Sequence, residues 1–321
     1  MGSKGPSARR AKARAGLGGG PGGGAPWPCL LLMTERFSAD WLALREPFDV
    51  AARSVVLAER LVGLLPARPR LLDLGAGTGG LFRWLAPLIG RAQVWTLADA
   101  DPELLADAFF SIADWAEGHG WTVTWPGHAA RRALLVHAPS GAWRVEALQV
   151  DLADAPAGLP LAAVDAVLSS ALLDLVSAAW LERLVAALRT PFLATLDVDG
   201  REAFLPAHPD DARVRSSFRR DQGRDKGFGR ALGVHAPRAL HAALAGRGFA
   251  VASAPSDWRI EAPALAMSRA LVEGHAEAAV RASPGAGHAI DAWRRARMRH
   301  GLQGRLAIRI GHRDSLGLPP R

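Results

Sequence analysis

The sequence predicts an α/β protein built on a doubly wound, mostly parallel sheet. Residues 71–74 have strand character and run into a glycine-rich turn at 75–80, and the amphipathic segment that follows ends at Gly90. Strand, tight turn and helix in this order open nucleotide-binding α/β domains. Further strands alternate with helical segments, which favours a parallel sheet covered by helices. The expected strands that follow are 94–97, 143–150, 164–170 and 191–197, with extra strands at 121–124 and 133–137 and a last pair at 249–252 and 305–310.

The glycine-rich turn fits two nucleotide-binding patterns. Gly75, Gly77 and Gly80 satisfy GxGxxG, which is typical of nicotinamide dinucleotide sites. Gly75, Gly77 and Gly79 satisfy GxGxG, with Asp73 two residues before the first glycine. Glycine permits the tight turn and lets a ligand lie against the backbone, and amides at a helix start can hold an acceptor or an anionic group. A glycine turn without a ligand is the structural alternative.

The GxGxG pattern with its preceding acid resembles motif I of the class I S-adenosylmethionine-dependent methyltransferases. The resemblance implies that Asp73 lies near the ammonium group of the methionine moiety. This explains a carboxylate at a position where burial without a partner costs stability. Dinucleotide folds usually carry an apolar or small residue there. S-adenosylmethionine is therefore the cofactor that the sequence predicts.

Two more acids follow predicted strands. Asp99 stands 20 residues after Gly79, where an acid can accept hydrogen bonds from both ribose hydroxyls of an adenosine; helping to cap the next helix is the alternative. In the resembling family an acid after the third strand meets the exocyclic amine of adenine, and Asp151 has this place, although a solvated loop acid is equally open. The predicted cofactor site contains Asp73, Gly75, Ala76, Gly77, Gly79, Asp99, Ala100, Asp151, Leu152 and Ser169.

In this family the end of the fourth strand faces the transferable methyl group. Residues 169–172 read Ser-Ser-Ala-Leu, whereas DNA and protein N-methyltransferases have Asn/Asp-Pro-Pro-aromatic here. This difference argues against adenine-N6 and glutamine amide substrates and indicates a small-molecule acceptor, methylated at O, N or C. Asp174 is the candidate general base, and a solvated Asp174 is the alternative. His208 and His312 are weaker candidates.

Charge and composition limit the partners. The formal net charge is +8, but residues 1–32 contain five basic residues and no acid, which leaves +3 for the rest of the chain. No basic patch interleaved with aromatic residues is visible, so no nucleic-acid partner is expected. No run of 18 apolar residues occurs, so no membrane partner is expected. The single cysteine is Cys29, and no metal is expected. The oligomeric state stays open. A cytoplasmic location is the default expectation.

The chain divides into a leader and one domain. Residues 1–32 are rich in glycine and arginine and are expected to be disordered, with Met33 as the physiological start. Residues 33–321 are expected to form a methyltransferase domain. Its special parts are N-terminal helices within 33–66, a lid-like polar loop at 199–233 and a helical insertion at 261–302.

The resemblance also implies a sheet topology. A Rossmann-like sheet of seven strands in the order 3-2-1-4-5-7-6 is expected, with the last strand antiparallel. The helical insertion then stands between the last two strands. In the N-terminal segment Pro47 is expected to separate a helix at 39–45 from a second helix at 48–65.

Three other functions stay open at this point. An NAD(P)-dependent Rossmann oxidoreductase agrees with the GxGxxG pattern, although the absence of tyrosine excludes Tyr/Lys short-chain chemistry. A catalytically inactive methyltransferase-like binding protein would keep the same glycines and acids. An RNA methyltransferase is the third alternative.

Overall fold

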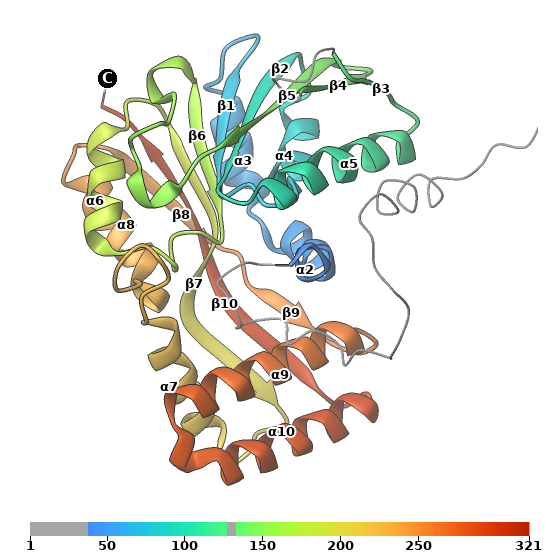
Figure 1. The fold of residues 1–321 in the computed structure, drawn as a ribbon, viewed down its shortest axis with the longest axis vertical. Coiled ribbons are helices and arrows are strands. Elements are labelled where there is room, and N and C mark those ends of the chain that lie inside the picture. The colour runs from blue at the N-terminus through green and yellow to red at the C-terminus, as the bar shows by residue number, and fades with distance from the viewer. Residues whose placement is uncertain (1–37, 127–132, 321) are drawn as a thin grey trace, which may run out of the picture.

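A single mixed sheet connects the two ends of the molecule (Figure 1). The computed structural model describes residues 38–126 and 133–320, so the predicted leader 1–32 and the start at Met33 lie outside the described residues. The strand order within these residues is β3-β4-β5-β2-β1-β6-β7-β10-β8, and β9 pairs with β10. The strands are β1 (Arg70–Leu74), β2 (Gln93–Asp99), β3 (Thr122–Thr124), β4 (Ala133–Ala138), β5 (Gly141–Gln149), β6 (Ala166–Ser170), β7 (Phe192–Leu205), β8 (Ala250–Pro255), β9 (Trp258–Ile260) and β10 (Ala307–Leu318).

The fold is Rossmann-like, as predicted, but the sheet is larger than predicted. Strands β5, β2, β1, β6 and β7 are parallel, and β10 is antiparallel to both β7 and β8. These seven strands keep the expected order. The described chain has ten strands rather than seven, because β3 and β4 extend one edge and β9 pairs with β10. The expected topology is therefore correct in outline and wrong in the strand count.

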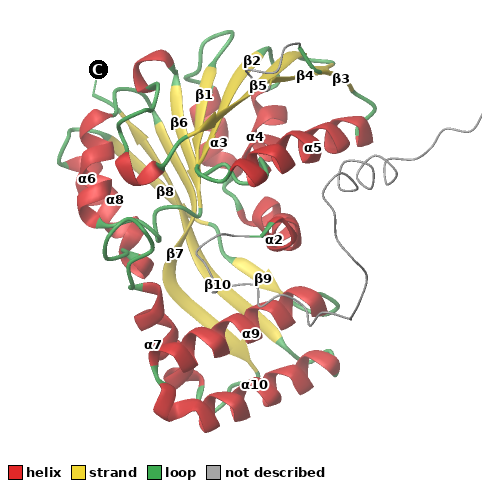
Figure 2. Ribbon diagram, viewed as in Figure 1, coloured by secondary structure: helices red, strands yellow, loops and turns green. Residues whose placement is uncertain are grey.

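Helices cover both faces of the parallel part (Figure 2). Leu71 packs with α3, α4 and α5, whereas Leu72 packs with α6 and α8 on the opposite face. This alternation is the two-residue repeat of a strand that is buried on both sides. The helices are α2 (Ala39–Ala52), α3 (Val55–Val62), α4 (Gly80–Ile89), α5 (Pro102–Gly118), α6 (Ala178–Ala187), α7 (Asp211–Gln222), α8 (Ala236–Ala245), α9 (Leu265–Ala282) and α10 (Gly287–Leu302).

Two long strands carry the sheet into a second layer of helices. Paired residues of β7 and β10 extend from Phe192↔Gly317 to Leu205↔Ala307. Their lower halves and β9 pack against α7, α9 and α10 (Figure 1). The insertion expected at 261–302 is thus the helix pair α9 and α10. Helix α2 lies between the parallel part of the sheet and the helices α9 and α10. Its Trp41 belongs to the apolar cluster that α7, α9 and α10 form with β9 and with the adjoining halves of β7 and β10.

The predicted helix break at Pro47 is wrong. Helix α2 continues through Pro47, and the chain breaks instead at Arg53 and Ser54. The buried side chain of Arg45 forms an ion pair with Asp49 at 3.0 Å, across the position of the proline. The break is fixed from outside the helix, because the backbone N–H of Ser54 donates to Asp314 of β10 at 2.7 Å. Tertiary contacts therefore override the local signal.

The predicted loop at 199–233 is also partly wrong, because β7 continues to Leu205 and α7 follows. The buried face of α7 contains polar residues, among them Ser217 and Asp221. Arg281 of α9 holds Asp221 at 2.9 Å, and Arg297 of α10 donates to Asp211. A helix held by ion pairs has no apolar stripe, so its sequence reads as a loop.

No helix in the described parts of the chain combines the length and the apolar character that crossing a bilayer requires.

Candidate functional site: the glycine loop and an adjoining cavity

The turn after β1 has the backbone that its glycines predict. Gly75, Gly77 and Gly79 have φ values of +67°, +52° and +76°, a region that favours glycine. A Cβ on Gly77 would lie 2.9 Å from Leu42 Cδ1 of α2, whereas the nearest atoms to a Cβ on Gly80 lie at 3.9 Å. Gly80 is the first residue of α4. The backbone therefore requires glycine at the GxGxG positions and not at the third position of GxGxxG.

Asp73 is a buried carboxylate without a partner. It lies in β1 just before the glycine turn, and its exposed fraction is 1%. Neither of its oxygens has a hydrogen-bond partner among the described residues. Burial raises the pKa of Asp73 to about 8, while the Arg53 guanidinium lowers it and Asp99 raises it further. The group is therefore mostly protonated at pH 7, because its ionised form is unfavourable unless a cation joins it. Its chemistry fits the ammonium group of an amino-acid ligand.

Asp99 connects the second strand to the glycine turn. Its Oδ2 accepts from the backbone N–H of Gly77 at 2.9 Å, and its Oδ1 accepts from Asp101 N at 3.0 Å. Burial raises the pKa of Asp99, and the hydrogen bonds from Asp101 and Gly77 oppose this. The helix cap of α5 is Asp101, which accepts from the first amides of that helix. Each oxygen of Asp99 accepts one of these bonds and keeps lone pairs for ribose hydroxyls.

The other predicted cofactor residues have varied surroundings. Ala100 is exposed directly after β2. Asp151 is exposed beyond β5, at the edge that carries Asp99, and accepts from Ala153 N at 2.9 Å. Leu152 is buried, and its carbonyl accepts from Trp180 Nε1 at 2.5 Å. Ser169 is fully buried, whereas Ser170, the next residue of β6, lines a cavity beside the glycine turn.

Helix α2 covers the glycine turn. Between them lies a cavity of about 60 Å³, lined among others by Leu42, Arg45, Arg53, Gly77 and Ser170. The Arg53 guanidinium donates to Ser170 Oγ at 2.9 Å, which ties the end of α2 to β6. This cavity is smaller than the about 300–1,000 Å³ of ligand pockets in general. The cavity alone therefore does not enclose a complete cofactor.

A second cavity, of about 140 Å³, adjoins the first. Arg45 lines both cavities, and consecutive residues of the chain face them, Ser170 the first and Ala171 the second. The walls of the second cavity come mainly from α2, β7, α7, β9, α9 and β10 and include Trp41, Phe218, Leu271 and Trp258. A ligand in this cavity would lie next to a ligand on the glycine turn.

Asp174, the predicted base, lines this second cavity. Its Oδ1 has no hydrogen-bond partner among the described residues. Burial raises the pKa of Asp174 to about 6, against the opposing effects of a backbone hydrogen bond, Arg45 and Lys226. The carboxylate is thus largely ionised at pH 7 and can accept a proton there. Asp174 thus lies in a cavity wall, whereas the alternative from the sequence was a solvated residue before a helix.

The two histidines differ in position. His312 lines the cavity, and burial lowers its pKa to about 3, so its ring is neutral at pH 7. His312 Nδ1 has no hydrogen-bond partner in the part of the chain that the structure describes. His208 accepts from Asp210 N at 3.2 Å and does not line the cavity.

Sequence reasoning missed the contribution of α2. Trp41, Arg45, Asp49 and Arg53 recur at every fourth residue and therefore share one helix face. Three charged residues on a buried face are rare without a structural or functional reason. This spacing is the signal that could have found Arg45 and Arg53.

Comparisons with known proteins give distant likenesses. No protein-family model matches the sequence. The bifunctional biotin biosynthesis protein BioCD of Bordetella avium is 53% identical over 53 residues, which span 16% of this chain and only 11% of that protein.

Similar solved structures include methyltransferases, the class that the sequence resembles. A cyclopropane-fatty-acyl-phospholipid synthase-like protein from Lactobacillus casei is 16% identical with a TM-score of 0.45, covering 88% of this chain and 94% of that one. A putative type II methyltransferase from Anaeromyxobacter dehalogenans is 18% identical with a TM-score of 0.44, covering 83% and 97%. A phosphoethanolamine N-methyltransferase from Haemonchus contortus, solved with S-adenosylhomocysteine, is 13% identical with a TM-score of 0.42, covering 88% and 57%. Likenesses this distant do not decide an activity.

Proposed function

We propose that this protein is an S-adenosylmethionine-dependent methyltransferase that moves a methyl group to an O, N or C atom of a small molecule. The observation that carries the proposal is the buried, unpartnered carboxylate of Asp73 beneath a glycine turn whose amide is held by Asp99. A ligand with an ammonium group and a ribose fits this pair of acids. The backbone requirement for Gly79 rather than Gly80 agrees with the methyltransferase pattern.

The roles of the chain's residues follow from their positions. Asp73 would hold the ammonium group, Asp99 the ribose hydroxyls, and Asp151 the adenine amine. When bound, the cofactor supplies a methyl group that its sulfonium has already activated. The protein mainly contributes alignment, which can provide about 7 to 11 kcal/mol.

The acceptor would occupy the cavity lined by Asp174. Since that cavity and the one above the glycine turn share Arg45, the acceptor atom and the cofactor would meet at the carboxyl end of β6. Asp174 would take a proton from the acceptor atom where that atom carries one. Helix α2 would exclude water by covering both ligands.

Calorimetry with S-adenosylmethionine and with NAD tests the cofactor. We expect S-adenosylmethionine to bind wild-type protein and bind at least tenfold more weakly to Asp73→Asn. The control variant Asp114→Asn changes an exposed carboxylate of α5 and should bind as wild type does. Binding of NAD alone would refute the proposal in favour of the oxidoreductase.

Release of S-adenosylhomocysteine in the presence of a metabolite extract tests catalysis. We expect release that depends on the extract. Cofactor binding without any release would favour the inactive binding protein. The small-molecule acceptor, the absence of a nucleic-acid partner and the cytoplasmic location stay predictions.

A further inference from the structure

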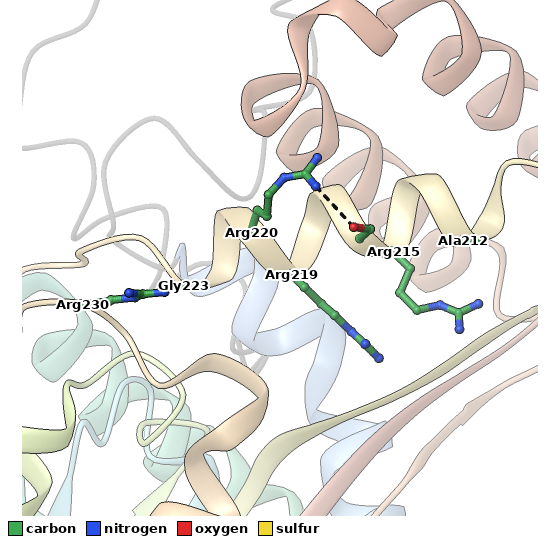
Figure 3. A pocket seen from close by; sticks show the side chains of 7 residues that line it. Ala212, Arg215, Arg219, Arg220, Gly223 and Arg230 are labelled. Carbon is green, nitrogen blue, oxygen red and sulfur yellow. Dashed lines mark hydrogen bonds between the residues drawn. The ribbon is translucent and has the colours of Figure 1, made fainter.

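An open groove of about 760 Å³ runs along the outer side of α7. Four arginines line it, three from α7 and Arg230 from the segment that follows (Figure 3). The remaining lining residues are small, namely Ala212, Ser216 and Gly223. Small residues between long cationic side chains leave room for a ligand beside the guanidinium groups.

The positive charge of this groove is mostly uncompensated. Arg219 donates to the carbonyl of Gly200, and Arg220 donates to hydroxyl groups, one of them Ser216 Oγ at 3.3 Å (Figure 3). Among the described residues, no carboxylate lies within ion-pair distance of Arg219, Arg220 or Arg230. Arg215 has Glu202 at 3.5 Å.

Neighbouring arginines show the contrast. Arg201 pairs with Asp199 and Asp257, and Arg224 pairs with Asp221. A nearby acid therefore neutralises each of these two arginines. Arg219, Arg220 and Arg230 differ, because none of them has such an acid among the described residues, although all three line the groove.

The groove borders the second cavity, in which the proposed acceptor would bind and which is called the acceptor cavity below. Gly200 and Glu202 line the cavity, and each contacts an arginine of the groove, Arg219 and Arg215 respectively. Phe218 and Gln222 of the same helix also line the cavity. Helix α7 thus presents one side to the acceptor cavity and its arginine side to the groove.

We propose that the acceptor carries a phosphate group, which the groove binds while the end to be methylated enters the cavity. Guanidinium groups recognise phosphate through paired, charge-assisted hydrogen bonds, and several arginines around one space favour an anion with multiple oxygens. The cavity of about 140 Å³ alone admits only a small group, so the groove would supply most of the binding surface. This proposal rests on the proposed function, and it names the substrate class of the same site.

Titration with inorganic pyrophosphate tests the groove directly. We expect wild-type protein to bind pyrophosphate and to bind it more weakly as salt is raised. The double variant Arg219→Gln/Arg230→Gln should lose at least tenfold in affinity. The matched control Arg213→Gln lies on the same helix outside the groove, where it faces Asp210 at 3.5 Å, and should bind as wild type does. Equal affinity in wild type and the double variant, or no binding by either, would overturn the proposal.

Folding of the double variant is checked by its thermal midpoint. Both side chains are exposed, so we expect a midpoint within a few degrees of wild type. Should the midpoint fall further, the single variant Arg230→Gln provides the same comparison, since the structure gives its side chain no hydrogen bond to lose among the described residues.

Turnover with metabolite extract tests the acceptor. Phosphatase treatment of the extract should reduce the release of S-adenosylhomocysteine at least tenfold. Release that survives phosphatase, with S-adenosylmethionine still bound, would overturn the phosphate proposal and leave the proposed function standing. Release that nuclease abolishes and phosphatase does not would identify a nucleic-acid acceptor instead. A protein that binds pyrophosphate but no S-adenosylmethionine would refute the proposed function and with it the acceptor role of the groove.

Discussion

Replacing Asp73 with asparagine should stabilise the fold and weaken cofactor binding at the same time. The pKa of Asp73 is raised from 3.8 to about 8 by burial. Between these two values the folded protein keeps the proton and the unfolded chain releases it. The stability contributed by the protonated group is fully present below pH about 4 and is lost as pH rises to about 8.

The magnitude follows from the slope of this linkage. One bound proton changes the free energy of unfolding by about 1.4 kcal/mol per pH unit. From pH 5 to pH 7 wild-type protein should therefore lose about 3 kcal/mol that Asp73→Asn does not lose. The advantage of the variant over wild type should widen by this amount over the same interval.

Urea denaturation at pH 5, 6 and 7 measures the effect. Wild type, Asp73→Asn and the exposed-carboxylate control Asp114→Asn are compared, and the control should follow wild type. A constant difference between Asp73→Asn and wild type over this range would show that the carboxyl group is not protonated in the folded protein, and the reasoning would fail.

Binding supplies an independent check on Asp73. An ammonium group beside Asp73 favours the ionised carboxylate, so cofactor binding near pH 7 should release up to about one proton. Calorimetry in buffers of different ionisation enthalpy counts this proton, and the Asp73→Asn variant should release none. A wild-type protein that binds S-adenosylmethionine without proton release would separate Asp73 from the ammonium group.

Three further predictions concern single side chains. Asp99→Ala should weaken S-adenosylmethionine binding by about 1 to 3 kcal/mol, measured by calorimetry, and unchanged affinity would remove Asp99 from the site. Gly77→Val should abolish that binding, because its φ of +52° and the 2.9 Å approach of Leu42 leave no room for a side chain; a variant that binds normally would contradict this geometry. Asp174→Asn should lower the rate about 10²- to 10⁴-fold and remove a rise in rate centred near pH 6, provided that the acceptor atom carries a proton; an unaltered pH–rate profile would exclude Asp174 as the base.

The sequence predicts the parts of this fold that depend on local chemistry. The strand, glycine turn and helix at 71–89 require only neighbouring residues, and the positive φ values at Gly75 and Gly77 agree with that expectation. Asp99 and Asp101 also lie where strand and cap patterns place them.

The parts that the sequence did not predict depend on distant partners. Helix α7 is held by Arg281 and Arg297, which lie far along the chain on α9 and α10. Helix α2 continues through Pro47, and the chain breaks next to Ser54, whose backbone N–H donates to Asp314 on β10. The choice of Ser170 over Ser169 as the cavity-lining residue depends on which face of β6 is covered, and this is a matter of tertiary packing.

The pairing of β7 with β10, which continues past two irregularities near His312 and Asp314, limits how ligands can enter. These strands extend from the parallel part of the sheet, which carries the glycine turn, to the helices α9 and α10. No linker separates the two halves of the molecule along these strands. A hinge motion that separated the two halves would have to break the hydrogen bonds between β7 and β10. Access is therefore expected to depend on movement of α2, and new acceptor preferences can arise by exchanging residues on α7, α9 and α10 while the sheet stays unchanged.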